Sequence, residues 1–419
     1  MNSKKIIEKT KSTGARYVFS GLLKTFSTAL SGIIILRWLH PEELGQWQSF
    51  LVFVGYLQIL TLGTTSGLNR EIAYLIGKGK KEEGIEKLRT VGYYTTTLSL
   101  LLMLIICATG IILYLIGMFD IEYMIMFILA FSTGALTIQT NFLGATYRSS
   151  SSFNYLSKVQ FYVSFLYFIL LPLIYFFDLW GYIIYQVSIA LALYLGYYWF
   201  RPYKVSYKFK TNIFKELVSI GLPMYIWNYL ASVSRSIPRL ILVTFGTPLI
   251  LGLYTPAGTI NTAMLSLPLY VNRYLNPKIS GLYGRTEDKR KVYIYTMSAV
   301  WKLFIAMSLI ALFISLTIPY IIEQFFPKYV EGTHAVQITV FSGVFFCMNN
   351  MIHNAINSLK AFKLFKIIVT LRYVNIVTFS AVGFFIFDSL LTIVSFGVLM
   401  AEIFNFLSYW RAFKKLSIN

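Results

Sequence analysis

Residues 41–45 read PEELG and residues 248–252 read PLILG, so one Pro-x-x-x-Gly pattern returns after a shift of 207 residues. The same shift, with no gap, relates a second group of residues. Leu68, Asn69, Ile72, Leu75 and Gly77 fall on Leu275, Asn276, Ile279, Leu282 and Gly284. Twice this shift nearly equals the 419-residue length. We therefore interpret the chain as an internal duplication, with an N-terminal half at 1–207 and a C-terminal half at 208–419.

The composition is that of an integral membrane protein. The chain is 57% hydrophobic and only 13% charged, whereas soluble domains carry about 25% charged residues. Apolar runs long enough to cross about 30 Å of hydrocarbon recur along it. We predict twelve spans, at about 15–37, 46–67, 91–117, 123–146, 159–177, 180–200, 216–244, 253–272, 293–318, 335–358, 367–386 and 390–410. The predicted fold is all-α, with two pseudo-symmetric six-helix lobes, and a duplicated apolar protein is typically a transporter.

The placement of the +20 net charge argues against nucleic acid as the partner. The two terminal segments and every second connection between spans together hold 29 of the 37 Lys and Arg residues. The remaining connections hold one, Lys328. This alternation is the positive-inside pattern of membrane proteins. It predicts that both termini are cytoplasmic and that most of the lysines fix the topology. The basic and aromatic linker at 201–215 is expected to lie on the inner membrane surface.

A few cations lie inside the predicted spans, where a charge costs at least about 2.5–3.5 kcal/mol. Lys24 is near the middle of the first span, and Arg235 and Arg239 are four residues apart on the seventh, which Pro238 should kink. The first and seventh spans are repeat partners. If the halves face each other across a cleft, we expect the side chains of Lys24, Arg235 and Arg239 to point into it. Such a basic cleft would suit an anionic substrate. The alternative is that each cation is a structural partner. Arg372, near a span end, is expected to snorkel to the surface.

Few acidic groups accompany these cations. Only Glu402 lies clearly inside a span, and His353 is the only histidine well inside one. Ion-coupled antiporters carry such groups as relays. Glu402 and His353 have no evident partners in the sequence, so each is a candidate for coupling or for structural packing. No catalytic residue, metal site or cofactor is predicted.

Two stretches show a family resemblance. Residues 67–83 read GLNREIAYLIGKGKKEE, and residues 220–257 read IGLPMYIWNYLASVSRSIPRLILVTFGTPLILGLYTPA. They resemble the exit of the second helix and the opening of the second half in polysaccharide flippases of the MOP superfamily, the Wzx-type exporters of O-antigen or capsule repeat units. The length, the twelve spans and the cytoplasmic termini are also similar.

The resemblance implies a MATE-like, V-shaped transporter of the bacterial inner membrane that works by alternating access. The substrate would be a lipid diphosphate-linked oligosaccharide, carried among membrane lipids and used by a polymerase and chain-length machinery. Basic cavity residues hold the diphosphate in this family. That role would fall to Lys24, Arg235 and Arg239, with Arg16, Arg70 and Arg273 near the cytoplasmic mouth.

Three other functions are compatible with parts of the sequence. A multidrug antiporter of the same superfamily is disfavoured because cationic drugs need acidic cavity residues, and this chain has basic ones. A flippase for another lipid-linked precursor, such as that of peptidoglycan, would share the basic cleft. A membrane glycosyltransferase or polymerase would use acidic residues in an external loop. Glu42 and Glu43 lie in one, but the loop is short and their repeat partners are Leu249 and Ile250.

Overall fold

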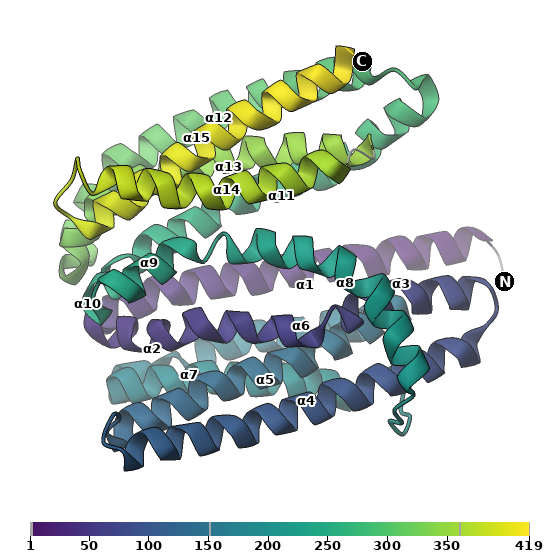
Figure 1. Cartoon of the computed structure of the whole chain (residues 1–419), viewed down its shortest axis with the longest axis horizontal. Coiled ribbons are helices and arrows are strands. Elements are labelled where there is room, and N and C mark those ends of the chain that lie inside the picture. Colours follow the sequence, from purple (N-terminus) through teal and green to yellow (C-terminus); the bar gives the residue numbers. More distant parts are fainter. Residues whose placement is uncertain (1–2, 151, 360–361, 419) are drawn as a thin grey trace. The chain divides into compact units, whose positions relative to one another are not determined.

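The structure is a computed structural model that describes residues 3–150, 152–359 and 362–418. Within these ranges every regular element is a helix (Figure 1), which confirms the all-α prediction. The chain forms two compact units. The first comprises Met1–Leu39 and Trp47–Tyr229, and the second comprises His40–Gln46 and Leu230–Asn419.

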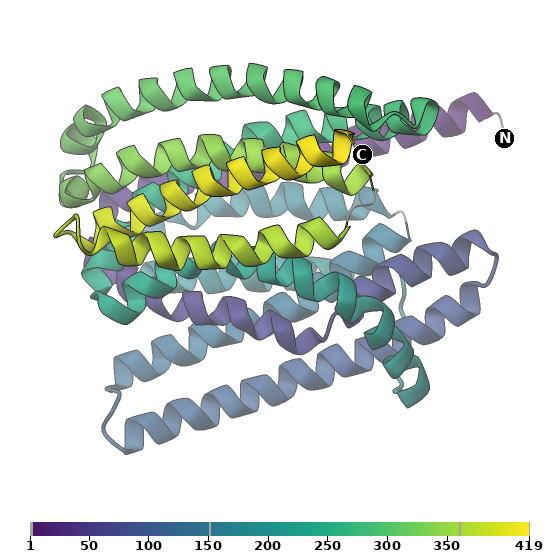
Figure 2. The same ribbon diagram turned by 45° about the horizontal axis from the view of Figure 1, so that its top comes forward.

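The first unit contains α1 (Ser3–Trp38), η1 (Gly55–Thr61), α3 (Thr64–Gly77), α4 (Lys81–Leu115), α5 (Ile121–Ser149), α6 (Phe153–Ile169) and α7 (Leu171–Trp199). The second contains α9 (Ile237–Phe245), α10 (Pro248–Leu253), α11 (Thr255–Thr286), α12 (Lys289–Phe325), η2 (Pro327–Gly332), α13 (Thr333–Ser358), α14 (Phe362–Gly383) and α15 (Leu390–Ile418). Two helices, α2 (Pro41–Val54) and α8 (Thr211–Val233), begin in one unit and end in the other. In the second unit α15 packs along both α13 and α14, as Figures 1 and 2 show.

The compact units do not divide the chain at 207/208. Most of α8, Thr211–Tyr229, belongs to the first unit, where it packs on η1 and α3. A Cβ atom on Gly221 would lie 2.2 Å from the carbonyl oxygen of Gly63, so the two backbones touch. The Tyr225 hydroxyl donates to the carbonyl oxygen of Gln58 at 2.6 Å. The boundary at 207/208 describes the sequence repeat, and as a lobe boundary it stays a prediction.

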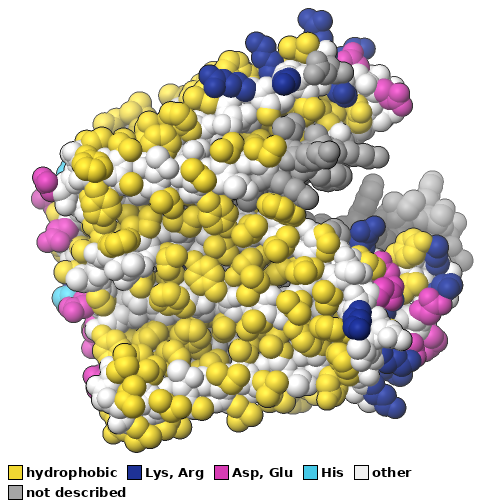
Figure 3. Space-filling model, in the orientation of Figure 1, with side chains coloured by type: hydrophobic (Ala, Val, Ile, Leu, Met, Phe, Trp, Pro, Cys, Tyr) yellow, Lys and Arg dark blue, Asp and Glu magenta, His cyan; other side chains and the backbone are white. Residues whose placement is uncertain are grey.

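The helices account for the twelve predicted spans. Among the described residues, seven helices are long and apolar enough to cross a membrane, and the bent pair formed by 41–61 and 64–76 makes an eighth. The other four predicted spans fall in α6 with the start of α7, α8 with α9, α10 with α11, and α14. Asp178, with φ of 45°, breaks α7 at the predicted connection 177–180. In each unit, Figure 3 shows apolar side chains over the middle of the helices and Lys and Arg gathered toward one end.

Each copy of the repeated pattern is the start of a helix. Pro41 opens α2 and Pro248 opens α10. Proline suits this place because its φ is already helical and its missing N–H is not needed there. The first turns are also capped, since Glu43 Oε2 accepts from the His40 amide at 3.0 Å and Thr247 Oγ1 accepts from the Ile250 amide at 3.4 Å.

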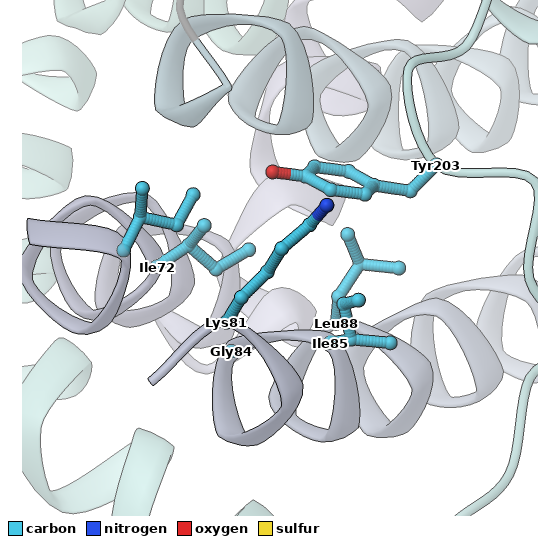
Figure 4. Close-up of a pocket in the computed structure, with 7 residues that line it drawn as sticks. Ile72, Lys81, Gly84, Ile85, Leu88 and Tyr203 are labelled. Atoms are coloured by element: carbon cyan, nitrogen blue, oxygen red, sulfur yellow. The ribbon is translucent and has the colours of Figure 1, made fainter. Parts of the chain in front are cut away.

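The linker before α8 packs on the protein rather than only on a membrane. Its aromatic side chains alternate with lysines, and the aromatic face meets α3 and α4. A Cβ atom on Gly92 would lie 2.6 Å from the Tyr207 ring, and Lys210 Nζ lies 2.7 Å from Glu86 Oε1. Figure 4 shows the Tyr203 ring over a small hollow beside Ile72, with the Lys81 side chain pointing toward that ring. The hollow leaves no room for a ligand, so we assign it a packing role.

Candidate functional site

A break between α8 and α9 positions Arg235. Residues 234–236 form a turn, and α9 begins at Ile237 with Pro238 in its first turn. Pro238 cannot donate a backbone hydrogen bond, so the helix is interrupted just before it, as predicted. Arg235 lies in this turn and Arg239 in α9, so the break separates the two arginines, which the four-residue spacing had predicted to share one face of the kinked seventh helix. The Arg235 Nη2 atom donates to Ser232 Oγ at 3.1 Å.

The two arginines face different neighbours within the second unit. Arg235 is exposed in the turn, and it interacts electrostatically with Arg372 on α14 and Glu402 on α15. Arg239 is half-buried, and a Cβ atom on Gly258 of α11 would lie 2.8 Å from its Nη2. The Arg239 guanidinium therefore rests on the α11 backbone. This places Arg235, rather than Arg239, beside the buried charges of this unit.

Glu402 has two partners, which corrects the expectation that it stands alone. Arg372 Nη2 lies 2.5 Å from Glu402 Oε1, and Asn349 Nδ2 on α13 donates to Glu402 Oε2 at 2.7 Å. Asn349 also donates to the backbone oxygen of Glu402 at 3.1 Å. Glu402 is only 2% exposed. A buried carboxylate requires such pairing, because an isolated one would lose several kcal/mol of hydration.

Arg372 therefore does not snorkel to the surface as the sequence suggested. Its side chain is 16% exposed, and its guanidinium carbon lies 4.8 Å from the centre of the Phe346 ring. The pull of Glu402 and the stacking on Phe346 hold it inside the helix bundle. Together Arg235, Arg372 and Glu402 carry one net positive charge. We call these three residues with Asn349 the charged cluster.

Further polar contacts continue from the charged cluster along the same helices. Asn375 Nδ2 on α14 donates to Asn405 Oδ1 on α15 at 3.1 Å. The Tyr373 hydroxyl donates to the carbonyl oxygen of Leu230 at the end of α8. His353 is half-buried, with its ring 6.1 Å from that of Tyr409. Coupling by His353 stays a prediction.

The remaining predicted site residues lie elsewhere. Lys24 is half-buried on α1 of the first unit, and it forms no ion pair with any residue that the structure describes. Arg16 on α1 and Arg70 on α3 are exposed. Arg273 lies in α11, but its side chain is outside the described residues. Because Lys24 and the arginines of the charged cluster belong to different units, their meeting in one cleft stays a prediction.

An ion triad in the first unit was missed by sequence reasoning. Lys87 Nζ on α4 lies 2.9 Å from Glu71 Oε2 on α3 and 2.7 Å from Glu216 Oε1 on α8. The lysine is largely buried, at 10% exposure of its side chain. We had interpreted such lysines as topological anchors. The triad instead ties the start of α8 to α3 and α4.

Comparison with known proteins identifies the family of the chain. A family model described as "Polysaccharide biosynthesis protein" matches residues 34–326. The chain belongs to this family. A search among curated proteins finds no match.

The fold is that of MOP-superfamily transporters. An inward-facing multidrug resistance MATE transporter of that superfamily aligns with a TM-score of 0.76 at 19% identity, over 94% of this chain and 96% of that one. The lipid II flippase MurJ, in an inward closed conformation, aligns with a TM-score of 0.74 at 12% identity, over 96% of this chain and 90% of that one. At these identities the likeness shows the fold alone. It confirms the predicted MATE-like architecture of a multi-pass membrane protein of the polysaccharide biosynthesis family.

Proposed function

We propose that the protein is a flippase that moves a lipid diphosphate-linked oligosaccharide, such as an O-antigen or capsule repeat unit, from the inner to the outer leaflet of a bacterial inner membrane. The family and the fold support a membrane transporter or flippase rather than an enzyme. The observation that carries the substrate class is Arg235, an exposed cation beside a buried ion pair in a transporter-like bundle.

The electrostatics of the charged cluster favour an anionic substrate. Glu402 is already ion-paired with Arg372 and accepts a hydrogen bond from Asn349, so within the described part of the cluster no unpaired carboxylate is left for a cationic drug. The net positive charge rests on Arg235. A guanidinium presents a planar fork of donors that matches phosphate oxygens. A diphosphate passing the cluster would gain charge-assisted hydrogen bonds in place of the water that it loses.

Lys24 would supply the matching cation from the first unit. A charge near the middle of a membrane helix must be solvated or paired, and the structure gives Lys24 no ion pair within its described residues. In the proposed mechanism the sugar and diphosphate follow the basic path while the lipid tail stays in the bilayer. Lys24→Arg should keep part of the export, because it keeps the charge, and Lys24→Ala should keep very little.

Export in cells tests the proposal. Cells that lack the protein should accumulate lipid-linked oligosaccharide on the cytoplasmic side, and the wild-type gene should clear it. Arg235→Ala should fail to clear it at normal protein level, and Arg235→Lys should clear it partly because the bidentate fork is lost. Lys302→Ala, which removes an exposed cation of α12, is the matched control and should behave like wild type. Full clearance by Arg235→Ala would remove Arg235 from the substrate path.

The multidrug transporter is the second candidate, since the MATE neighbours share the fold. It predicts that cells lacking the protein become sensitive to cationic drugs and keep normal surface polysaccharide. The paired state of Glu402 argues against it.

A further inference from the structure

A hollow of about 610 Å³ opens at one end of the second unit. Its volume lies within the roughly 300–1,000 Å³ of sites that take small molecules. It is lined by the end of α9, by α10, by η2 and by the connection from α14 into α15, and none of its lining residues is part of the charged cluster. The charge pattern places the connections 245–252, 319–334 and 386–390, which supply much of this lining, on the outer side of the membrane.

Two carboxylates line the hollow without an internal partner. Glu331 at the end of η2 and Asp388 just before α15 are both exposed. Neither side chain forms an ion pair or a hydrogen bond with any residue that the structure describes. Among the described lining residues there is no Lys or Arg. The hollow is therefore negatively charged, and charge complementarity favours a cationic occupant.

The mouth of the hollow combines these charges with exposed aromatic rings. Phe245 and Phe384 belong to the lining, are 69% and 52% exposed, and meet edge to face with their ring centres 6.5 Å apart. The next residue, Phe385, is 92% exposed. Large apolar side chains gathered on the surface of a membrane protein contact lipid, whereas carboxylates need water or a polar partner. The hollow therefore lies at the boundary between the acyl chains and the head groups.

A phospholipid with an ammonium head group matches both parts of this site. Its ammonium would lie against Glu331 and Asp388, and its acyl chains would run past Phe245 and Phe384 into the bilayer. Lys328 precedes Glu331 by three residues on η2, and residues at this spacing eclipse each other in a 3₁₀-helix. The lipid phosphate would thus find a cation on the same side of η2. A free amine would leave the apolar mouth unused, and an anionic lipid would be repelled by the carboxylates.

We propose that the hollow binds a phospholipid of the outer leaflet through its ammonium head group, as in phosphatidylethanolamine. The bound lipid joins η2 to the start of α15, because its ammonium meets one carboxylate from each. The site is separate from the proposed substrate path, and it does not depend on what the protein transports.

Lipid binding to the purified full chain tests the site. The protein in detergent would be titrated with phosphatidylethanolamine or with phosphatidylglycerol of the same acyl chains, and bound lipid would be counted by native mass spectrometry. Wild-type protein should prefer phosphatidylethanolamine. Glu331→Gln combined with Asp388→Asn should weaken its binding about tenfold, the loss expected for two exposed charge pairs, and should abolish the preference.

A matched control removes the same charge from elsewhere on the outer side of the second unit. Glu42→Gln combined with Glu323→Gln neutralises two exposed carboxylates that do not line the hollow. This variant should bind phosphatidylethanolamine like wild type. A loss equal to that of the Glu331 and Asp388 variant would show a general effect of surface charge and overturn the site.

Competition distinguishes a lipid from a soluble amine. Ethanolamine phosphate has the head group but no acyl chains, and at the same concentration it should not displace the lipid. Displacement by it would overturn the lipid assignment. Equal binding of the two phospholipids by wild type, or unchanged binding of phosphatidylethanolamine by the Glu331 and Asp388 variant, would overturn the site itself. None of these measurements uses export, so failure of the proposed flippase function leaves the test valid.

Discussion

Replacing Glu402 with Gln should destabilise the protein by about 3 kcal/mol. The change keeps the shape of the side chain and removes the charge that Arg372 Nη2 meets at 2.5 Å. Breaking a buried pair leaves an uncompensated charge and costs about 3–5 kcal/mol, whereas an exposed pair is worth at most about 1 kcal/mol. Glu402 is 2% exposed and Arg372 16%, so solvent screening is slight and the buried value applies near its lower end.

A double-mutant cycle measures this pair directly. Arg372→Gln should cost a similar amount, and the double variant should cost no more than either single one. The coupling energy is then about 3 kcal/mol. The assay is the free energy of unfolding of the purified protein in detergent, with Lys302→Gln as the exposed control. Additive effects of the two changes, or a single-variant cost below about 1 kcal/mol, would refute the buried pair.

Charge reversal should separate the partners in cells. Arg372→Glu combined with Glu402→Arg should recover part of the protein level that each single change loses. Lys24→Glu combined with Glu402→Lys should not recover export, because Arg372 is the partner of Glu402. Recovery by the Lys24 exchange would contradict the assignment of Arg372.

Three other predictions follow from the first unit and the topology. Gly221→Ala should destabilise the protein by about 1–3 kcal/mol, because its Cβ would lie 2.2 Å from the Gly63 oxygen, whereas Gly55→Ala should be neutral by the same unfolding assay. Lys87→Met should destabilise the protein more than Lys81→Met in the same unfolding assay. Only the Lys87 change leaves Glu71 and Glu216 without their ion-pair partner. A cysteine at Glu43 should react with an impermeant thiol reagent from outside and one at Lys208 should not; the opposite pattern in intact cells would reverse the orientation.

The spans could be predicted because their signal is local. Apolar length found the seven helices and the bent pair that are long and apolar enough to cross a membrane among the described residues. Pro238 predicted the break before α9. The helix ends were less predictable. The apolar run at 91–117 marks a helix that begins at Lys81, since the first turns of α4 are charged and hydropathy registers only the apolar part. Similarly, Pro248–Leu253 was expected to be mostly a loop and is the helix α10.

The charged cluster was only partly predictable because its contacts are long-range. Intramembrane charge singled out Arg235 and Glu402. The sequence did not indicate that Arg372 on α14 and Asn349 on α13 point at Glu402, because that depends on how α13, α14 and α15 pack. Hydrophobicity places a residue at a depth in the membrane, whereas its partner is fixed by helix rotation. The ion triad of Lys87, Glu71 and Glu216 was not predicted for the same reason, because it joins three helices whose packing the sequence does not show.

Lipid translocation by the purified protein tests the central claim most directly. Proteoliposomes would carry a lipid diphosphate-linked oligosaccharide in both leaflets, and a membrane-impermeant sugar-modifying enzyme would report how much becomes accessible. Wild-type protein should make the inner pool accessible, Arg235→Ala should not, and Lys302→Ala should match wild type. A neutral glycolipid that lacks the diphosphate should not be moved. Equal translocation by Arg235→Ala, or of the neutral glycolipid, would contradict the role of the charged cluster in carrying an anionic head group.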